Sequence, residues 1–392
     1  MRKLLIWACL LPFIGYGQIG RQIGVNNSAM VGDMWGTQKT WPQKMLDSYV
    51  SINSPYVAYT QVEKDTILGR LSQAYIVNTF GPSGLNKTTC DFFMIFWNSN
   101  TSTALATRTN TKTGSTLRWN YGGGNIYSQN NLPAQINNGI ISVTSADGFG
   151  GWTILDLNTN NYRYKLPIGS LPTGLTLLSL YSNQFTGDWT NITLPTGLAV
   201  LYLQSNQFTG DWTNKTLPSG LGQLSLYSNQ FTGDWTNKTL PSGLTILYLH
   251  VNQFTGDWTN KTLPTGLGQL YLQSNQFTGA PPNIAPHATN GLNYQAQAPN
   301  AFTTASNVTT FRKAMTVFNL QGNALPTAKV DELLHNMNLY YTANAPTQNC
   351  TINLSGSTMG IPTGGASNTD VQALIALWTA AGKTLTITVR TS

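Results

Sequence analysis

Leucines recur at a fixed spacing through the middle of the chain. The segment Leu-Pro-(Thr/Ser)-Gly-Leu begins at positions 171, 194, 217, 240 and 263, which gives a constant period of 23. Each unit continues with alternating leucines and then an asparagine, which in the first unit are Leu178, Leu180 and Asn183. The Leu-x-Leu alternation predicts a short strand with one buried face. Because one unit cannot bury its apolar side alone, successive units are expected to stack about 4.8 Å apart around a continuous core.

A weaker unit precedes these five. Leu155, Leu157, Asn160 and Tyr162 repeat the same pattern one period earlier. The solenoid is therefore predicted to begin before the first regular repeat and to occupy residues 151–282. The fold class is expected to be a mainly β solenoid with a parallel sheet.

The C-terminal part, residues 283–392, is predicted to combine irregular repeats with an α/β cap. An open end of a solenoid exposes apolar surface, so a cap is expected there. The expected elements are a strand at 318–323, a helix around 330–337 with Thr327 as its N-cap, a strand at 351–356, a helix at 371–381 opened by Asn368-Thr369-Asp370, and a strand at 384–389.

The N-terminus has the pattern of a secretory signal peptide. Arg2 and Lys3 precede an apolar run from Leu4 to Ile14, which is too short to span a bilayer. Residues 1–17 are therefore expected to be removed near Gly17-Gln18, which predicts a secreted protein or one on the outer cell surface. No other segment is long enough to be an integral membrane segment.

Two regions lie between the signal and the repeats. Residues 18–88 are expected to be partly helical, with a fold that the pattern does not identify. Residues 89–150 contain short apolar runs separated by Gly, Asn and Thr, which predicts a β-sandwich-like module. The segments 116–124 and 139–144 give this module a resemblance to PKD-like domains.

The repeats resemble the leucine-rich-repeat family over residues 153–282, in the subtype whose units carry Asn-x-(Leu/Phe)-(Thr/Ser)-Gly-x-Ile-Pro. The resemblance implies a curved solenoid with a parallel sheet on its concave face, through which family members usually bind proteins and less often glycans or lipids. The C-terminal part resembles modules that follow such repeats in some bacterial surface proteins and phage tail-associated proteins. That likeness rests on the Asn-Leu-Ser-Gly step at 353–356 and on the final helix-strand pair.

Several polar residues recur once per repeat. An asparagine after each strand can satisfy main-chain groups where the chain turns. This structural Asn column comprises Asn160, Asn183, Asn206, Asn229, Asn252 and Asn275. Tryptophans at 189, 212, 235 and 258 take the place of the family's Ile and are expected to pack inward, the alternative being an exposed carbohydrate platform.

Each of these tryptophans follows an aspartate. The aspartates at 188, 211, 234 and 257 are expected to stack like charges about 5 Å apart. The lysines at 215, 238 and 261 lie four residues after three of them and could offset the repulsion. A calcium site here would lack the clustered oxygen ligands that calcium needs, so no metal site is predicted.

Residues between the buried leucines are expected to face the concave side. Their side chains are aromatic or neutral and polar, which suits an uncharged extended ligand such as a polypeptide segment or a glycan. The alternative is that the tyrosines only pack on one another. The candidate ligand-binding residues are Tyr181, Tyr202, Gln204, Tyr227, Tyr248, His250, Tyr271 and Gln273.

Composition narrows the function further. Charged residues make up only 9 % of the chain, and the net charge of +7 comes from basic residues without a cluster, which argues against a nucleic-acid partner. The three histidines lie near no nucleophile motif, and no paired carboxylates stand out, so no catalytic residue and no cofactor is predicted. Cys90 and Cys350 alone would remain in the mature chain.

The expected function is binding of an extracellular protein partner in adhesion or interaction, and the protein is not expected to be an enzyme. Recognition of a glycan or host receptor, including a phage-tail-like role, is the alternative. A hydrolase hidden in the N-terminal region is the third.

Overall fold

The computed structural model describes residues 171–259, 261–282, 284, 291–304 and 308–391, and nearer the N-terminus the segments 92–98, 111–112, 118–122, 125–128, 140–145, 152–158 and 162–165. The expected signal peptide and the region 18–88 lie outside these residues. Two compact units, Met1–Gly187 and Asp188–Ser392, make up the chain. The described repeats form a parallel β-solenoid, which confirms the predicted fold class.

The unit Met1–Gly187 contains both antiparallel and parallel strand pairs. The antiparallel strands are β1 (Phe92–Asn98), β5 (Ile140–Ser145), β3 (Arg118–Gly122) and β4 (Asn125–Ser128), in that order. β7 (Tyr162–Lys165) pairs antiparallel with β1 and parallel with β9 (Gln184–Asp188). β2 (Thr111–Lys112) pairs antiparallel with β6 (Trp152–Asp156), which pairs parallel with β8 (Leu177–Ser179). The β-sandwich prediction for 89–150 stays a prediction.

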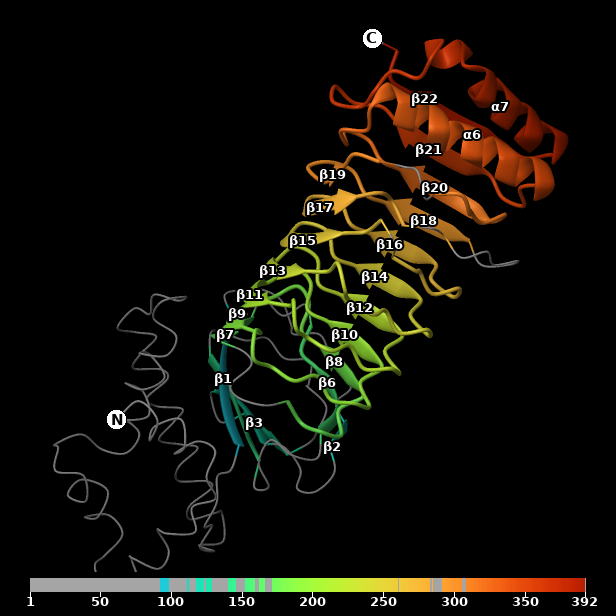
Figure 1. Cartoon of the computed structure of the whole chain (residues 1–392). Coiled ribbons are helices and arrows are strands. Elements are labelled where there is room, and N and C mark those ends of the chain that lie inside the picture. Colours follow the sequence, from blue (N-terminus) through green and yellow to red (C-terminus); the bar gives the residue numbers. More distant parts are fainter. Residues whose placement is uncertain are drawn as a thin grey trace, which may run out of the picture. The chain divides into compact units, whose positions relative to one another are not determined.

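In the unit Asp188–Ser392, every coil contributes strands to parallel sheets (Figure 1). The longer sheet contains, in order, β10 (Val200–Tyr202), β12 (Gln223–Ser225), β14 (Ile246–Tyr248), β16 (Gln269–Tyr271), β18 (Leu292–Gln295), β20 (Met315–Asn319), β21 (Cys350–Leu354) and β22 (Leu385–Val389). The shorter sheet contains β11 (Gln207–Asp211), β13 (Gln230–Asp234), β15 (Gln253–Asp257), β17 (Gln276–Gly279) and β19 (Ala301–Phe302).

Leucine, phenylalanine and tryptophan fill the space between these sheets. Leu201, Leu203, Phe208 and Trp212 are each 0 % exposed, as are the equivalent residues of the next two coils. Successive phenylalanine rings stack with their centroids 6.2 to 6.5 Å apart. Each tryptophan meets the phenylalanine of the following coil edge-on at 5.2 to 5.5 Å. The expectation that the tryptophans pack inward is confirmed.

The two sheets of this unit differ in register. In the longer sheet Tyr202 lies opposite Ser225, which is the equivalent residue of the next coil. In the shorter sheet Asp211 lies opposite Thr232, which precedes the equivalent residue, Asp234, by two positions. Equivalent residues therefore lie side by side in the longer sheet, whereas in the shorter sheet they are displaced from one another.

This stagger corrects the expectation of stacked aspartates. The residue beside Asp211 is a threonine rather than another aspartate, and the same holds for Asp234 and Asp257. The Oδ1 atom of Asp211 accepts hydrogen bonds from the main-chain N–H and the hydroxyl of Thr213, at 2.8 and 2.6 Å. The Asp211 N–H donates to the Thr190 hydroxyl of the preceding coil at 2.9 Å. Threonine thus separates the like charges.

The C-terminal elements follow the predicted order. Two helices, α6 (Thr327–Ala343) and α7 (Thr369–Ala380), and a short 3-10 turn η1 (Gly365–Ser367) accompany β20 to β22 (Figure 1). Asn368 caps α7, since its side chain accepts hydrogen bonds from the N–H groups of Asp370 and Val371. The expected N-cap of α6 was wrong by one residue: Pro326 precedes the helix in an extended conformation, and Thr327 is already helical. Within the described residues, neither helix combines the length and apolar character needed to cross a membrane.

Candidate ligand-binding face

Seven of the eight predicted binding residues lie on the outer side of the strands β10 to β16 or directly after them. We call them the tyrosine face: Tyr202, Gln204, Tyr227, Tyr248, His250, Tyr271 and Gln273. All seven are half-buried. The leucines that alternate with them along the chain point into the core. The eighth, Tyr181, belongs to the unit Met1–Gly187 and is half-buried there as well.

Four rings of the tyrosine face form one cluster. Tyr227 stacks on His250 with centroids 4.3 Å apart, and Tyr248 stacks on Tyr271 at 4.7 Å. The two pairs touch edge-on, since Tyr227 and Tyr248 lie 6.1 Å apart at an angle of 67°. One broad face of each ring is therefore covered within the cluster, and the edge-on contacts hold the two pairs together.

The phenol groups are tied to the neighbouring coil. Tyr202 donates a hydrogen bond from its hydroxyl to Gln223 Oε1, and Tyr248 donates in the same way to Gln269 Oε1. These contacts fix the tyrosines in one orientation and direct the tips of the rings along the solenoid rather than away from it. The in-register pairing of the longer sheet makes each contact possible, because it brings consecutive coils level.

An amide network continues the tyrosine face, and the sequence did not reveal it. Asn293 donates from Nδ2 to the Tyr271 hydroxyl at 2.9 Å, and Gln295 donates from Nε2 to Asn293 Oδ1 at 3.1 Å. Gln297 and Asn319 both donate to Gln295 Oε1, at 2.8 and 3.2 Å. The coil between β16 and β18 is longer than the regular period by a single position, which hides these residues from a search at that period.

The face carries no formal charge near neutral pH. Burial lowers the pKa of His250 from 6.5 to about 4, so the ring is neutral there. Burial also raises the pKa of Tyr248, which keeps the phenol protonated. Buried side-chain atoms without a hydrogen-bond partner include His250 Nδ1, Gln204 Oε1 and Gln273 Oε1. The surface is therefore aromatic and neutral, and these three atoms lie beneath it.

One position at the border of the face has unusual backbone geometry. In each coil, one residue directly after the tyrosine face adopts a left-handed conformation. Its φ lies between 53 and 56° at Ser205, Ser228, Val251 and Ser274. Serine tolerates this conformation better than a β-branched side chain does. Val251 is also 46 % exposed, which is uncommon for an apolar residue in the described part of this chain.

The asparagine column links coils from within. Asn229 donates from Nδ2 to the carbonyl of Leu203 in the preceding coil and to that of Leu226 in its own, at 3.0 and 3.1 Å. Its Oδ1 accepts from the N–H of Phe208 at 3.0 Å. Asn300 and Asn323, which the regular period does not reach, make the same kinds of contact. Asn160 lies outside the described residues.

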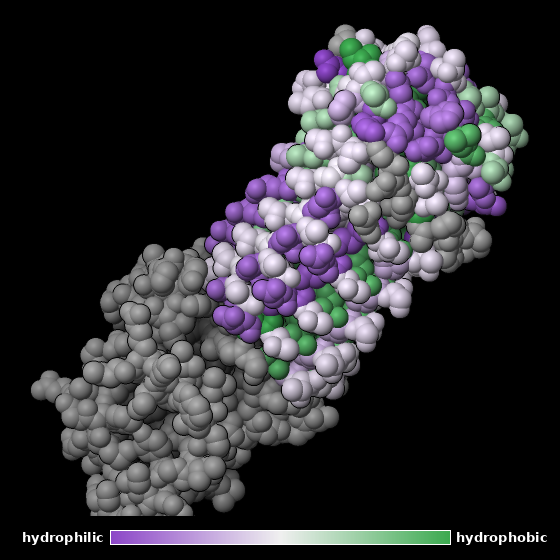
Figure 2. Space-filling model, viewed as in Figure 1, coloured by the Kyte–Doolittle hydropathy of each residue, from purple (hydrophilic) through white to green (hydrophobic). Residues whose placement is uncertain are grey.

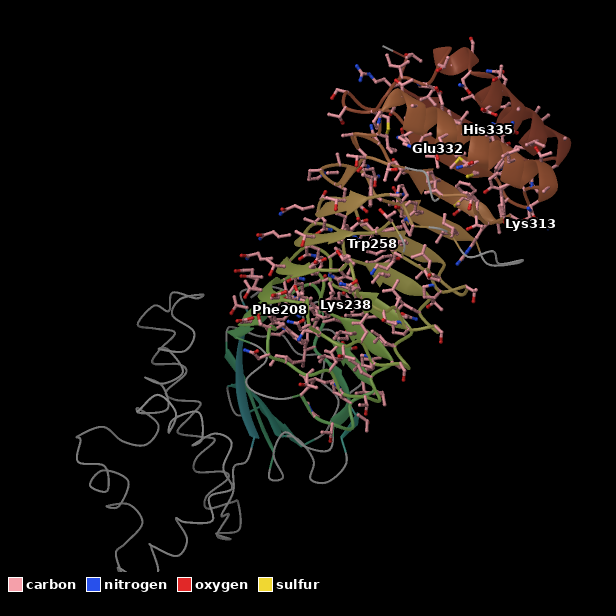
Figure 3. All side chains as sticks on the ribbon, viewed as in Figure 1. Phe208, Lys238, Trp258, Lys313, Glu332 and His335 are labelled. Atoms are coloured by element: carbon pink, nitrogen blue, oxygen red, sulfur yellow. The ribbon has the colours of Figure 1, made fainter. Side chains whose placement is uncertain are left out.

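The lysine column has a role beyond its expected attraction to the aspartates. Lys215 donates from Nζ to the carbonyls of Trp189 and Ile192 in the preceding coil, at 2.7 and 2.5 Å. Lys238 and Lys261 repeat this arrangement, and all three lysines lie over indole rings, at 5.3 to 5.7 Å from the centroids. Figure 3 labels Lys238 within the stack of coils, together with Phe208 and Trp258. These lysines act mainly as main-chain caps, and burial lowers the pKa of Lys215 and Lys261 to about 8.

A second surface is strongly polar. In Figure 2 hydrophilic residues gather over the edge of the coils that carries β11 to β17. A half-open groove of about 700 Å³ lies between two successive coils, lined by threonine, asparagine and serine together with Asp234, Lys215 and Lys238. Among the residues that the structure describes, no three His, Cys, Asp or Glu side chains come together in a group that could hold a metal ion.

Comparison with known proteins does not identify a family for this chain. No family model matches the chain. No curated protein matches it either. Solved structures that match include the crystal structure of PEPR1–AtPEP1, with 20 % sequence identity and a TM-score of 0.33. That match covers 51 % of this chain but only 29 % of the other, so this chain corresponds to well under half of that protein's length.

Proposed function

We propose that this chain is an exported leucine-rich-repeat protein that binds a protein partner through the tyrosine face. The observation that carries the proposal is the continuous, neutral surface formed by the aromatic cluster and the amide network. Tyrosine contributes contact area and a polar tip together, which explains its enrichment in protein interfaces. The charged n-region and apolar run of residues 1–14 support export.

The ring geometry supports a protein partner over a glycan. Stacking covers one broad face of each ring in the pairs Tyr227–His250, at 4.3 Å, and Tyr248–Tyr271, at 4.7 Å. A sugar ring that needs a flat aromatic platform would find one face of each of these rings covered, and the remaining ring contacts of the cluster are edge-on. Main-chain groups of a polypeptide can instead pair with the amide and phenol groups along the surface.

The proposed function predicts that substitutions on the tyrosine face abolish partner binding and leave the fold intact. The face variant Tyr227→Ser/Tyr248→Ser removes half of the aromatic cluster. The control variant Gln230→Ser/Gln253→Ser changes exposed residues of the shorter sheet. Both variants and the unchanged protein are used as bait on extracts of surface proteins, with captured proteins identified by mass spectrometry.

We expect at least one protein to be captured by the unchanged protein and the control variant, with recovery at least tenfold lower on the face variant. Circular dichroism checks that both variants keep the β spectrum. Equal recovery on all three baits would contradict the proposal, as would the absence of any specifically captured protein.

A further inference from the structure

One coil departs from its neighbours at two adjacent positions. Where two of the other regular coils have Gln-Ser and two have Tyr-Ser, this coil has His250-Val251. Some positions in and before the strand also vary from coil to coil, but each of the other four coils has serine where this coil has Val251. Both residues lie at the border of the tyrosine face.

The backbone holds Val251 in its strained conformation from both sides. Its N–H donates to the carbonyl of Gln273 in the next coil at 3.0 Å, and its carbonyl accepts from the N–H of Asn229 at 3.3 Å. Ser228 is held by an equivalent bond to the carbonyl of His250 at 3.1 Å. Stacking of the coils thus imposes φ of 56° on Val251. A β-branched residue in this region is an outlier, and such outliers concentrate at functional sites.

Burial of the Val251 side chain compensates only in part for this backbone strain. Val251 is 46 % exposed as a residue, whereas the core leucines of the same coil, Leu247 and Leu249, are 0 % exposed. A serine would satisfy the backbone with less strain and would not expose apolar surface to water. Valine at this position therefore combines a strained backbone with less burial than the core residues of its coil.

From these observations we infer that Val251 is a specificity-determining residue that receives an aliphatic side chain of a neutral, extended polypeptide segment. The inference rests on the proposed function. Gln295 lies two coil steps of about 4.8 Å from Tyr248, and Val251 follows Tyr248 by three positions, so a segment of roughly four or five extended residues reaches from Val251 to the Asn293–Gln295 amides. The aliphatic side chain covers Val251, while main-chain groups of the segment pair with the amide network. A glycan lacks such a side chain.

A library of random 12-residue peptides displayed on phage serves as the probe. It is selected on the full chain, and enriched peptides are synthesised and titrated by calorimetry against four proteins: the unchanged chain, Val251→Ser, Val251→Ile and Tyr227→Ser/Tyr248→Ser. We expect enriched peptides to share an aliphatic residue, to bind Val251→Ser about tenfold more weakly, and to bind Val251→Ile as they bind the unchanged chain.

Thermal unfolding separates this role from a structural one. Because serine relieves the backbone strain, Val251→Ser is expected to have a Tm equal to or above that of the unchanged chain while it binds more weakly. A lower Tm of Val251→Ser with unchanged affinity would show a structural residue and overturn the inference. So would the absence of enriched peptides, or the selection from an array of neutral glycans of a ligand that Val251→Ser still binds.

Failure of this inference can be told apart from failure of the proposed function. Peptides that lose affinity for the double tyrosine variant but keep it for Val251→Ser would overturn only the role of Val251. Peptides that bind all four proteins equally would overturn both.

Discussion

At the scale of single residues, this solenoid places polar side chains where the stacked backbone needs them. Asn229 joins two coils through three main-chain contacts, and Lys238 donates to carbonyls of the coil before it. Buried main-chain groups are costly when they lack a partner, so a repeat that exposes carbonyls at the same turn each time must supply the same donor each time. The regular recurrence of these residues is therefore structural.

His250 gives a prediction on pH that belongs to the same scale. Its pKa is lowered by burial from 6.5 to about 4, so between these values the unfolded chain binds a proton that the folded chain does not. The free energy of unfolding is therefore full above pH 6.5 and decreases as the pH falls toward 4. The loss should be roughly 2 kcal/mol, less than the full shift implies because the ring is only half-buried.

The measurement is urea unfolding between pH 7.5 and 4, compared with His250→Gln, since glutamine occupies the equivalent positions 204 and 273. Carboxylates titrate in both proteins and cancel in the difference. A difference between the two unfolding free energies that stays constant over this range would refute the buried neutral imidazole.

At the scale of elements, one glycine per coil permits the close approach of neighbouring strands in the shorter sheet. Gly233 has φ of +133°, and a Cβ atom there would lie 2.6 Å from the N of Trp212 and 2.8 Å from the N of Thr213. Main-chain atoms of the preceding coil thus occupy the space that a side chain would need. The two-position stagger of this sheet depends on that approach.

Gly233→Ala is therefore expected to destabilise the protein by about 3 kcal/mol or more, because both the conformation and the space oppose a side chain. Gly243 is a matched control in the next coil, since a Cβ there meets nothing within 4 Å. Gly243→Ala should change the free energy of unfolding by less than about 1 kcal/mol. Chemical unfolding of both variants measures the contrast, and similar values for the two would argue against the tight stagger.

At the scale of the whole molecule, the regular coils of the unit Asp188–Ser392 are nearly interchangeable. Each contributes the same leucines, phenylalanine and tryptophan to the core, and each contacts the coils before and after it. In such an assembly stability is close to a sum of repeat and interface contributions. One coil can then be removed without loss of the fold, provided that the period is kept.

Deletion of the segment 218–240, which joins Leu217 to Pro241, removes one full period and recreates the Leu-Pro step of the other coils. We expect this variant to keep the β spectrum and cooperative unfolding, with a somewhat lower Tm. Deletion of the segment 218–229 removes about half a coil and should abolish cooperative unfolding, because the leucines that follow no longer face the core. Calorimetry distinguishes the two, and a folded half-coil variant would be incompatible with the stacked core.

The sequence predicted the core well and the surface less completely. Leu201 and Leu203 follow a local alternation, so their burial could be predicted before any contact was known. The amides of Asn293 and Gln295 were missed because a longer coil interrupts the period just before them. The tyrosine positions were predicted, but the stacking of Tyr227 on His250 was not, since it depends on how two coils meet.

By itself, the sequence determined the repeat and the strand in each unit. It also determined that the leucine, phenylalanine and tryptophan side chains point into the core. These follow from spacing within one coil, where covalent geometry limits the choices. Only the tertiary structure decided that Thr232 lies beside Asp211 and that the Nζ of Lys215 donates to the carbonyl of Trp189. One constant period is compatible with strands that pair in register, as in the longer sheet, and with strands displaced by two positions, as in the shorter sheet. The close packing of the coils, rather than the period, selects between them.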